Sequence, residues 1–295
     1  MLEKLTTEAR NPASEQLDQL SALEIVQLMN REDQSVPRAV EQEAASIATA
    51  IDVITARLRD GGRLVYVGAG TSGRLGVLDA SECPPTFNTD PRQVVGIIAG
   101  GESALIRAAE GAEDRPEDAV RDLAQRNVDH RDVVVGIATS GRTPYVIAAL
   151  QYAREQGAYA IGLVCNRGSE VESVADLMIT PVVGPEIVSG STRLKAGTAT
   201  KLVLNMLTTG AMVRLGKTFG NLMVDLRATN IKLKHRTNRI VRDLTGLDEA
   251  AAQRLLDDCQ GELKTAIVAE LADITPEEAR QRLAQHQGRL RAALD

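Results

Sequence analysis

Cysteine, histidine and basic charge are all scarce in this 295-residue chain, and each shortage argues against a class of protein. Cys83, Cys165 and Cys259 are scattered without paired or histidine-associated spacing, so neither a disulfide framework nor a zinc site is indicated. Only three histidines are present, and we expect no metal at the functional site. A net charge of -6, with no run of basic residues, argues against a nucleic-acid surface.

Long apolar runs are also missing. No stretch approaches the ~20 residues that a bilayer-spanning helix needs, and Met1–Leu5 lacks the apolar segment of a secretory signal. We therefore expect no membrane partner and a cytoplasmic location. With 43% hydrophobic residues, the chain is long enough to bury the core of one large domain or two small ones.

Short apolar runs alternate with helical stretches from residue 63 onward. The runs cover residues 64–67, 94–99, 133–138, 159–164 and 177–181. Continuous apolar runs are typical of parallel strands that helices cover on both faces, and such sheets bind ligands at the carboxyl ends of their strands. The predicted fold is α/β, with a doubly wound parallel five-stranded sheet.

Helical patterns flank this sheet and predict three parts. Residues 1–60 are expected to form helices that pack on the core or on a dimer partner, and residues 61–245 the sheet domain. Residues 246–295 predict a small helical subdomain, with helix starts at Asp248 and Thr275. Nothing in this last part indicates chemistry.

Two loops rich in glycine and hydroxyl groups follow predicted strands. Glycine lets the backbone approach a ligand, and the N–H groups that open the next helix, together with hydroxyls, suit a phosphate. The candidate residues are Gly70, Thr71 and Ser72 in the first loop, and Thr139, Ser140 and Thr143 in the second. Two such loops indicate a small-molecule phosphosugar.

A dinucleotide is the alternative ligand of the first loop. Gly68, Gly70 and Gly73 satisfy the G-x-G-x-x-G pattern, and Glu102 after the second strand is placed to bind a ribose. Dinucleotide binding does not require the second hydroxyl loop, so we favour the phosphosugar.

Glu82 precedes Pro84 and Pro85, which are predicted to end the helix that the first loop opens. A carboxylate at the negative end of a helix is suited to act as a general base, and the alternative is a capping or solvated side chain. A continuous helix would separate Ser72 from Glu82 by roughly 15 Å. Either the helix is broken, the Ser140 loop holds most of the phosphate, or Glu82 serves another subunit.

Further polar candidates follow the second and fifth strands. Glu113 lies in an acidic segment near the expected ligand edge, where the alternative is a solvated loop. Glu186, Ser191 and Lys195 lie before a long helix predicted from about residue 193 to 215. They are candidates to bind sugar hydroxyls or phosphate, and the alternative is capping of a buried helix.

Four segments together resemble the N-acetylmuramic acid 6-phosphate etherases, over nearly the whole chain. They are residues 68–74, 81–86, 110–114 and 184–198. The last is similar to a signature shared with glucokinase regulatory proteins, which are longer and bind fructose phosphates without turnover. The chain length and Glu82 favour the etherases.

This resemblance implies a sugar isomerase (SIS) domain of flavodoxin-like topology and a homodimer, with no cofactor. It also implies cleavage of the D-lactyl ether of N-acetylmuramic acid 6-phosphate during cell-wall sugar recycling. By resemblance, Glu82 is the catalytic acid/base and Glu113 a second active-site carboxylate. A phosphosugar sensor and an aldose-ketose isomerase remain open, since both would use the same fold.

Overall fold

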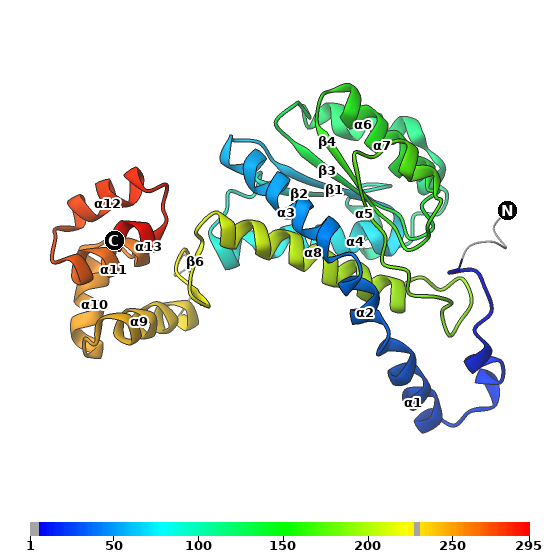
Figure 1. The fold of residues 1–295 in the computed structure, drawn as a ribbon, viewed down its shortest axis with the longest axis horizontal. Coiled ribbons are helices and arrows are strands. Elements are labelled where there is room, and N and C mark those ends of the chain that lie inside the picture. The colour runs from blue at the N-terminus through cyan, green and yellow to red at the C-terminus, as the bar shows by residue number, and fades with distance from the viewer. Residues whose placement is uncertain (1–5, 227–230) are drawn as a thin grey trace. The chain divides into compact units, whose positions relative to one another are not determined.

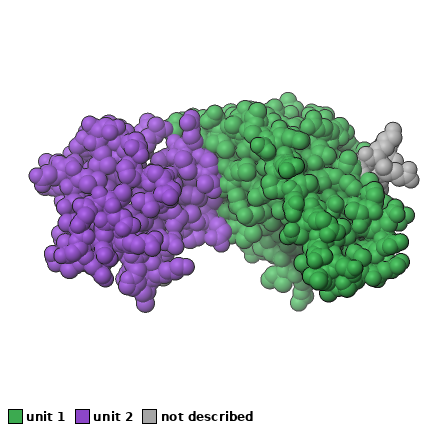
Figure 2. Space-filling view, turned by 60° about the horizontal axis from the view of Figure 1, so that its bottom comes forward, with its two compact units in different colours: residues 1–81, 91–208 green, residues 82–90, 209–295 purple. Residues whose placement is uncertain are grey.

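The computed structural model describes residues 6–226 and 231–295 (Figure 1). Met1–Leu5, where the sequence shows no secretory signal, lies outside the described residues. Among the residues described, no helix is both long and apolar enough to cross a bilayer. The chain divides into two compact units, one of residues 1–81 and 91–208, the other of residues 82–90 and 209–295 (Figure 2).

The first unit is built on a five-stranded parallel sheet with strand order β2-β1-β3-β4-β5. The strands are β1 (Leu64–Gly68), β2 (Val94–Ile98), β3 (Val133–Ile137), β4 (Tyr159–Leu163) and β5 (Leu177–Ile179). The sequence predicted all five, with ends that differ by at most two residues. Every residue of β1 and β3 is buried, as expected for central strands covered on both faces.

Helices cover both faces of this sheet, which confirms the doubly wound fold (Figure 1). Val65 of β1 points into a core shared with Leu123 and Leu150 from two helices on one face. Tyr66 points the opposite way, against Gly76 of another helix. The helices are α1 (Ala22–Asp33), α2 (Val36–Glu41), α3 (Ala44–Arg59), α4 (Gly70–Phe87), α5 (Ser103–Ile106), α6 (Pro116–Gln125), α7 (Pro144–Glu155) and α8 (Lys195–Arg214), with 3-10 turns at Pro12–Ser14, Leu17–Gln19, Ala112–Asp114 and Glu170–Ser173.

The second unit is mainly helical and has its own apolar core, which includes Ile240, Leu256 and Ile267. Asp248 and Thr275 cap their helices with side-chain oxygens, which confirms both predicted starts. The domain boundaries that the sequence predicted near residues 60 and 245 stay predictions. Besides residues 82–90, this unit contains residues 209–295. Its elements are β6 (Thr218–Phe219), β7 (Leu222–Met223), α9 (Ile231–Thr245), α10 (Glu249–Asp258), α11 (Leu263–Ala272), α12 (Pro276–Gln285) and α13 (Leu290–Leu294).

Pro84 and Pro85 do not end α4, so that prediction is wrong. The helix continues to Phe87 because the φ angle of proline is compatible with a helix and only two backbone donors are lost. Asn88 ends it instead, with φ 51° and an N–H that donates to the carbonyl of Pro84 over 2.9 Å. Glu82 therefore lies before the last turn of the helix rather than at its end.

Candidate functional site

The carboxyl edge of the sheet between β1 and β3 is where this topology forms a ligand crevice. In the order β2-β1-β3-β4-β5 the winding direction changes at these two strands, and ligands of such sheets bind at that switch point. The loops after β1 and β3 flank it, because the two strands are parallel neighbours. The structure therefore brings both predicted hydroxyl loops to one edge of the sheet.

The first loop turns from β1 into α4 with very little space between strand and helix. Gly70 has φ 53°, and a Cβ atom on Gly73 would lie 2.5 Å from the carbonyl oxygen of Gly68. The first turn of α4 can therefore pack this closely only because residue 73 is glycine. The first N–H groups of a helix have no partner within it and suit an anion. Thr71 and Ser72 lie half-buried in this turn.

The second loop, residues 139–143, leaves β3 and enters α7. Its backbone is fixed by neighbours: the N–H of Cys165 donates to the carbonyl of Thr139 over 2.9 Å, and Gly141 takes a φ of 70°. The side chains of Thr139, Ser140 and Thr143 are half-buried. Their hydroxyl groups are thus carried by a well-supported loop at the switch point.

Asn166, three residues after the end of β4, is a polar residue of this edge that sequence reasoning missed. Its Nδ2 donates to the carbonyl of Thr139 over 2.9 Å and to Oγ1 of Thr7 over 3.1 Å. Its Oδ1 accepts from the N–H of Thr6 over 2.9 Å. One buried amide thus ties the N-terminal segment to the second loop. The signal available was its place at the carboxyl end of a predicted strand.

Glu186 caps α8. Its side chain is fully buried, and its two oxygens accept from the N–H groups of Lys195 and Ala196, each over 2.9 Å. These are the contacts that the capping alternative describes. The start of α8 also lies next to the first loop, since a Cβ atom on Gly197 would lie 3.8 Å from Cγ2 of Thr71. Substrate binding by Glu186 stays a prediction.

Lys195 is also buried, and its Nζ lies 2.9 Å from Oε2 of Glu32 on α1. Asn11 donates to the same oxygen over 2.7 Å. Burial opposes ionisation of Glu32, but the hydrogen bonds from Lys195 and Asn11 outweigh it and lower the pKa of that carboxyl. Lys195, the first residue of α8, is therefore held in an ion pair with Glu32. Ser191 lies half-buried in the loop before α8. Their binding roles stay predictions.

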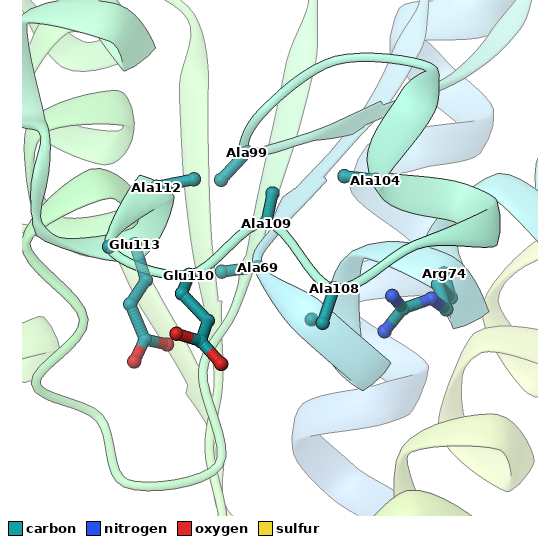
Figure 3. A pocket seen from close by; sticks show the side chains of 11 residues that line it. Ala69, Arg74, Ala99, Ala104, Ala108, Ala109, Glu110, Ala112 and Glu113 are labelled. Carbon is teal, nitrogen blue, oxygen red and sulfur yellow. The ribbon is translucent and has the colours of Figure 1, made fainter.

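Glu113 lines a pocket of about 160 Å³ beside the first loop, at the ends of β1 and β2. The residue belongs to the 3-10 turn Ala112–Asp114. Figure 3 shows the carboxylates of Glu110 and Glu113 close together on one side of this pocket. Alanine side chains form much of the remaining wall. The predicted second carboxylate therefore lies at the expected edge of the sheet.

Arg74, in the first turns of α4, lines the same pocket and is another residue that sequence reasoning missed. Its Nε donates to the carbonyl of Leu105 over 3.1 Å, and its Nη2 to that of Arg107 over 3.5 Å. The guanidinium lies across the pocket from the two carboxylates (Figure 3). The pocket thus combines a cation, two carboxylates and a wall of methyl groups.

Asp79 fixes α4 within the first unit. The carboxylate is buried and accepts from the hydroxyl of Tyr66 over 3.0 Å, from Nδ2 of Asn205 over 2.7 Å and from Oγ1 of Thr208 over 3.3 Å. Burial raises its pKa, although these three hydrogen bonds act in the opposite direction. The network joins α4 to β1 and α8, the elements that carry the first loop and the Glu186 cap.

Glu82 is exposed on α4 and belongs to the second compact unit. The helix runs without a break from Gly70 to Phe87, so a broken helix is excluded. Ser72 and Glu82 are separated by roughly 15 Å along its axis, at ~1.5 Å per residue. The structure does not bring Glu82 together with the first loop along this helix. Either the Ser140 loop holds most of the phosphate, or Glu82 serves another subunit.

Comparisons with known proteins identify the family. The N-terminal SIS domain of glucokinase regulatory protein matches residues 46–154, and the SIS domain matches residues 114–210. N-acetylmuramic acid 6-phosphate etherase of Rhodopirellula baltica is 61% identical over 98% of this chain and 96% of its own length. The chain belongs to the N-acetylmuramic acid 6-phosphate etherase family. Etherase 1 of Vibrio cholerae is 54% identical over 100% of this chain and 98% of its own.

A solved structure agrees with the SIS fold of this etherase-family chain. The phosphoheptose isomerase from Neisseria gonorrhoeae superposes with a TM-score of 0.50, over 64% of this chain and 98% of its own. Its sequence is 18% identical, so the likeness concerns the fold alone. The family resemblance seen in the sequence is confirmed by the full-length relatives.

Proposed function

We propose that this chain cleaves the D-lactyl ether of N-acetylmuramic acid 6-phosphate to give N-acetylglucosamine 6-phosphate and D-lactate. The observation that carries this proposal is 61% identity over 98% of the chain to a protein named as that etherase. Two hydroxyl loops at the switch point and a carboxylate pocket beside them support a phosphosugar substrate. As the resemblance implies, we place the reaction in the recycling of cell-wall sugars.

The reaction proceeds by elimination followed by addition of water. In the opened sugar, the aldehyde at carbon 1 acidifies the proton on carbon 2. A base removes that proton, the bond between carbon 3 and the ether oxygen breaks, and lactate leaves with the electron pair and a proton. Water then adds to carbon 3 of the unsaturated aldehyde, and a proton returns to carbon 2. One water molecule is consumed, and neither step requires a redox cofactor.

We assign the proton transfers to the two glutamates. Glu82 acts as the base on carbon 2, and Glu113 protonates the departing ether oxygen or assists ring opening. Each such transfer contributes about 10²- to 10⁴-fold to the rate. Thr71, Ser72 and the hydroxyls of residues 139–143 anchor the phosphate, which holds the sugar for both steps. The half-buried placement of these hydroxyls supports that role.

We also propose a homodimer in which Glu82 serves the site of the second subunit. The unbroken helix α4 supports this, because it separates Glu82 from the first loop of its own chain by roughly 15 Å. The alternative is that the second loop holds the phosphate alone. We propose the cytoplasm as the location. A phosphorylated sugar crosses a bilayer poorly, because its charge would have to be desolvated, so it is consumed in the compartment in which it is formed.

A phosphosugar sensor is the second candidate, because residues 46–154 match a domain of glucokinase regulatory protein. A sensor would bind the substrate without consuming it, and an aldose-ketose isomerase would produce a ketose without lactate. The test is to incubate the purified protein with N-acetylmuramic acid 6-phosphate and measure lactate, ketose and bound substrate. Stoichiometric lactate and N-acetylglucosamine 6-phosphate support the etherase. Binding of the substrate without release of lactate would support the sensor instead.

A further inference from the structure

The charge of Arg74 has no carboxylate partner among the residues that the structure describes. Both of its hydrogen bonds go to backbone carbonyls, those of Leu105 and Arg107. Lys195, another cation near this edge, is paired with Glu32. Two N–H groups on Nη1 of Arg74 take no part in the hydrogen bonds to Leu105 and Arg107. A full positive charge with unused donors therefore borders the pocket of Glu113.

The wall of this pocket is made of methyl groups. A Cβ atom on Gly100 would lie 2.7 Å from Cβ of Ala109 and 3.4 Å from those of Ala104 and Ala112. These alanines therefore lie close around the glycine, with no room for larger side chains there. The remaining alanines of the wall are Ala69, Ala99 and Ala108. A pocket of about 160 Å³ with such a wall accepts a small apolar group.

The third feature of the pocket is the pair of carboxylates, Glu110 and Glu113, opposite Arg74 (Figure 3). An entering anion is attracted to one flank of the pocket and repelled from the other. A ligand that fits all three features carries a carboxylate, a methyl group and an oxygen that takes up a proton.

We propose that this pocket is the lactyl subsite of the active site. The lactyl carboxylate binds the guanidinium of Arg74, its methyl group packs on the alanine wall, and its ether oxygen lies toward Glu113. Arginine suits this role because its planar fork matches a carboxylate with two parallel hydrogen bonds. The proposal rests on the proposed function, since it takes the lactyl group from that substrate. It makes Arg74 the residue that distinguishes the substrate from the lactate-free product.

The experiment compares binding of N-acetylmuramic acid 6-phosphate and N-acetylglucosamine 6-phosphate to Glu82→Gln, which we expect to turn the substrate over far more slowly, and to the same protein with Arg74→Gln added. Glutamine retains an N–H donor that can reach the carbonyl of Leu105 but has no charge. We expect Arg74→Gln to weaken binding of the lactyl sugar at least tenfold and to change binding of the product less than twofold. Arg107→Gln is the matched control, because it removes a neighbouring charge that does not line the pocket.

If the affinities for both sugars fell equally, Arg74 would contribute to phosphate binding or to the fold. If neither affinity fell, Arg74 would not be part of the site. Either result overturns the proposal. A substrate whose lactyl carboxylate is replaced by a carboxamide tests it without changing Arg74: it should bind Glu82→Gln tenfold more weakly than the natural substrate does. Ala108→Val, which narrows the pocket, should act in the same selective way. These are binding measurements, so a wild type that releases no lactate would refute the proposed function without deciding the subsite.

Discussion

At the scale of single residues, the two glutamates that we expect to move protons have different surroundings. Both are exposed, but Glu113 lines a pocket opposite Arg74 and Glu82 lies on α4. We predict that Glu82→Gln lowers kcat by about 10²- to 10⁴-fold, because glutamine cannot accept the proton from carbon 2. Substrate affinity should change little. Steady-state kinetics check this, with the exposed Glu102→Gln as a control that should retain wild-type kcat.

Asp79 provides a prediction about stability and pH. Burial raises the pKa of this carboxyl, so the folded protein binds its proton more tightly than the unfolded chain does. The resulting stabilisation is present near pH 4 and is lost as the pH rises through the raised pKa. Relative to Asp79→Asn, which does not titrate, wild type should therefore lose Tm as the pH rises from about 4, the ordinary pKa of an aspartate, toward neutral. Thermal unfolding of both proteins across this range measures the difference.

Asp18→Asn, at an exposed position, is the matched control for the loss of one negative charge. Suppose instead that the Tm of wild type minus that of Asp79→Asn were constant with pH or rose toward neutral pH. The described surroundings of Asp79 would then not determine how its carboxyl titrates.

At the scale of elements, Asn166 joins the N-terminal segment to the loop after β3 through Thr7 and Thr139. We predict that Asn166→Ala raises KM for the phosphosugar about tenfold, since the carbonyl of Thr139 loses one of its two donors and the loop loosens. The effect on kcat should be smaller. Asn30→Ala on the exposed side of α1 is the control. A fall in kcat at unchanged KM would contradict a role in phosphate binding.

The contact between β1 and α4 predicts a contrast between two glycines. A Cβ atom on Gly73 would lie 2.5 Å from the carbonyl oxygen of Gly68, but one on Gly197 in α8 would meet nothing nearer than 3.6 Å. Gly73→Ala should therefore destabilise the protein by about 1–3 kcal/mol and weaken phosphate binding. Gly197→Ala should be tolerated. Tm values and protection by inorganic phosphate measure both, and equal effects would refute the close packing described.

The strands were predictable because a continuous apolar run between polar loops has few other structures available. The end of α4 was not, because Pro84 and Pro85 fit a last helical turn and Asn88 provides the terminus. The loops after β1 and β3 were found from glycine and hydroxyl content alone.

Polar contacts between residues far apart in the chain could not be predicted from the sequence. Arg74 meets the carbonyl of Leu105, thirty-one residues away, and Asn166 meets Thr7, 159 residues away. Neither pairing leaves a periodic or compositional pattern. The same holds for Lys195, whose side chain pairs with Glu32 from an N-terminal helix.

At the scale of the whole molecule, an SIS sheet supplies the ligand edge and a second unit carries Glu82 together with the C-terminal helices. Membership of the etherase family is shown by relatives that match over the full chain. The proposed mechanism specifies which bond of the ether breaks and which proton exchanges with solvent. Elimination breaks the bond on the sugar side of the ether oxygen and exchanges the proton on carbon 2.

The most direct test is turnover of N-acetylmuramic acid 6-phosphate in deuterated water enriched in oxygen-18, with mass analysis of both products. We predict deuterium at carbon 2 and oxygen-18 at carbon 3 of N-acetylglucosamine 6-phosphate, with unlabelled lactate at its ether-derived oxygen. Oxygen-18 in that lactate position, with no deuterium at carbon 2, would show displacement at the lactyl carbon and contradict the proposed elimination.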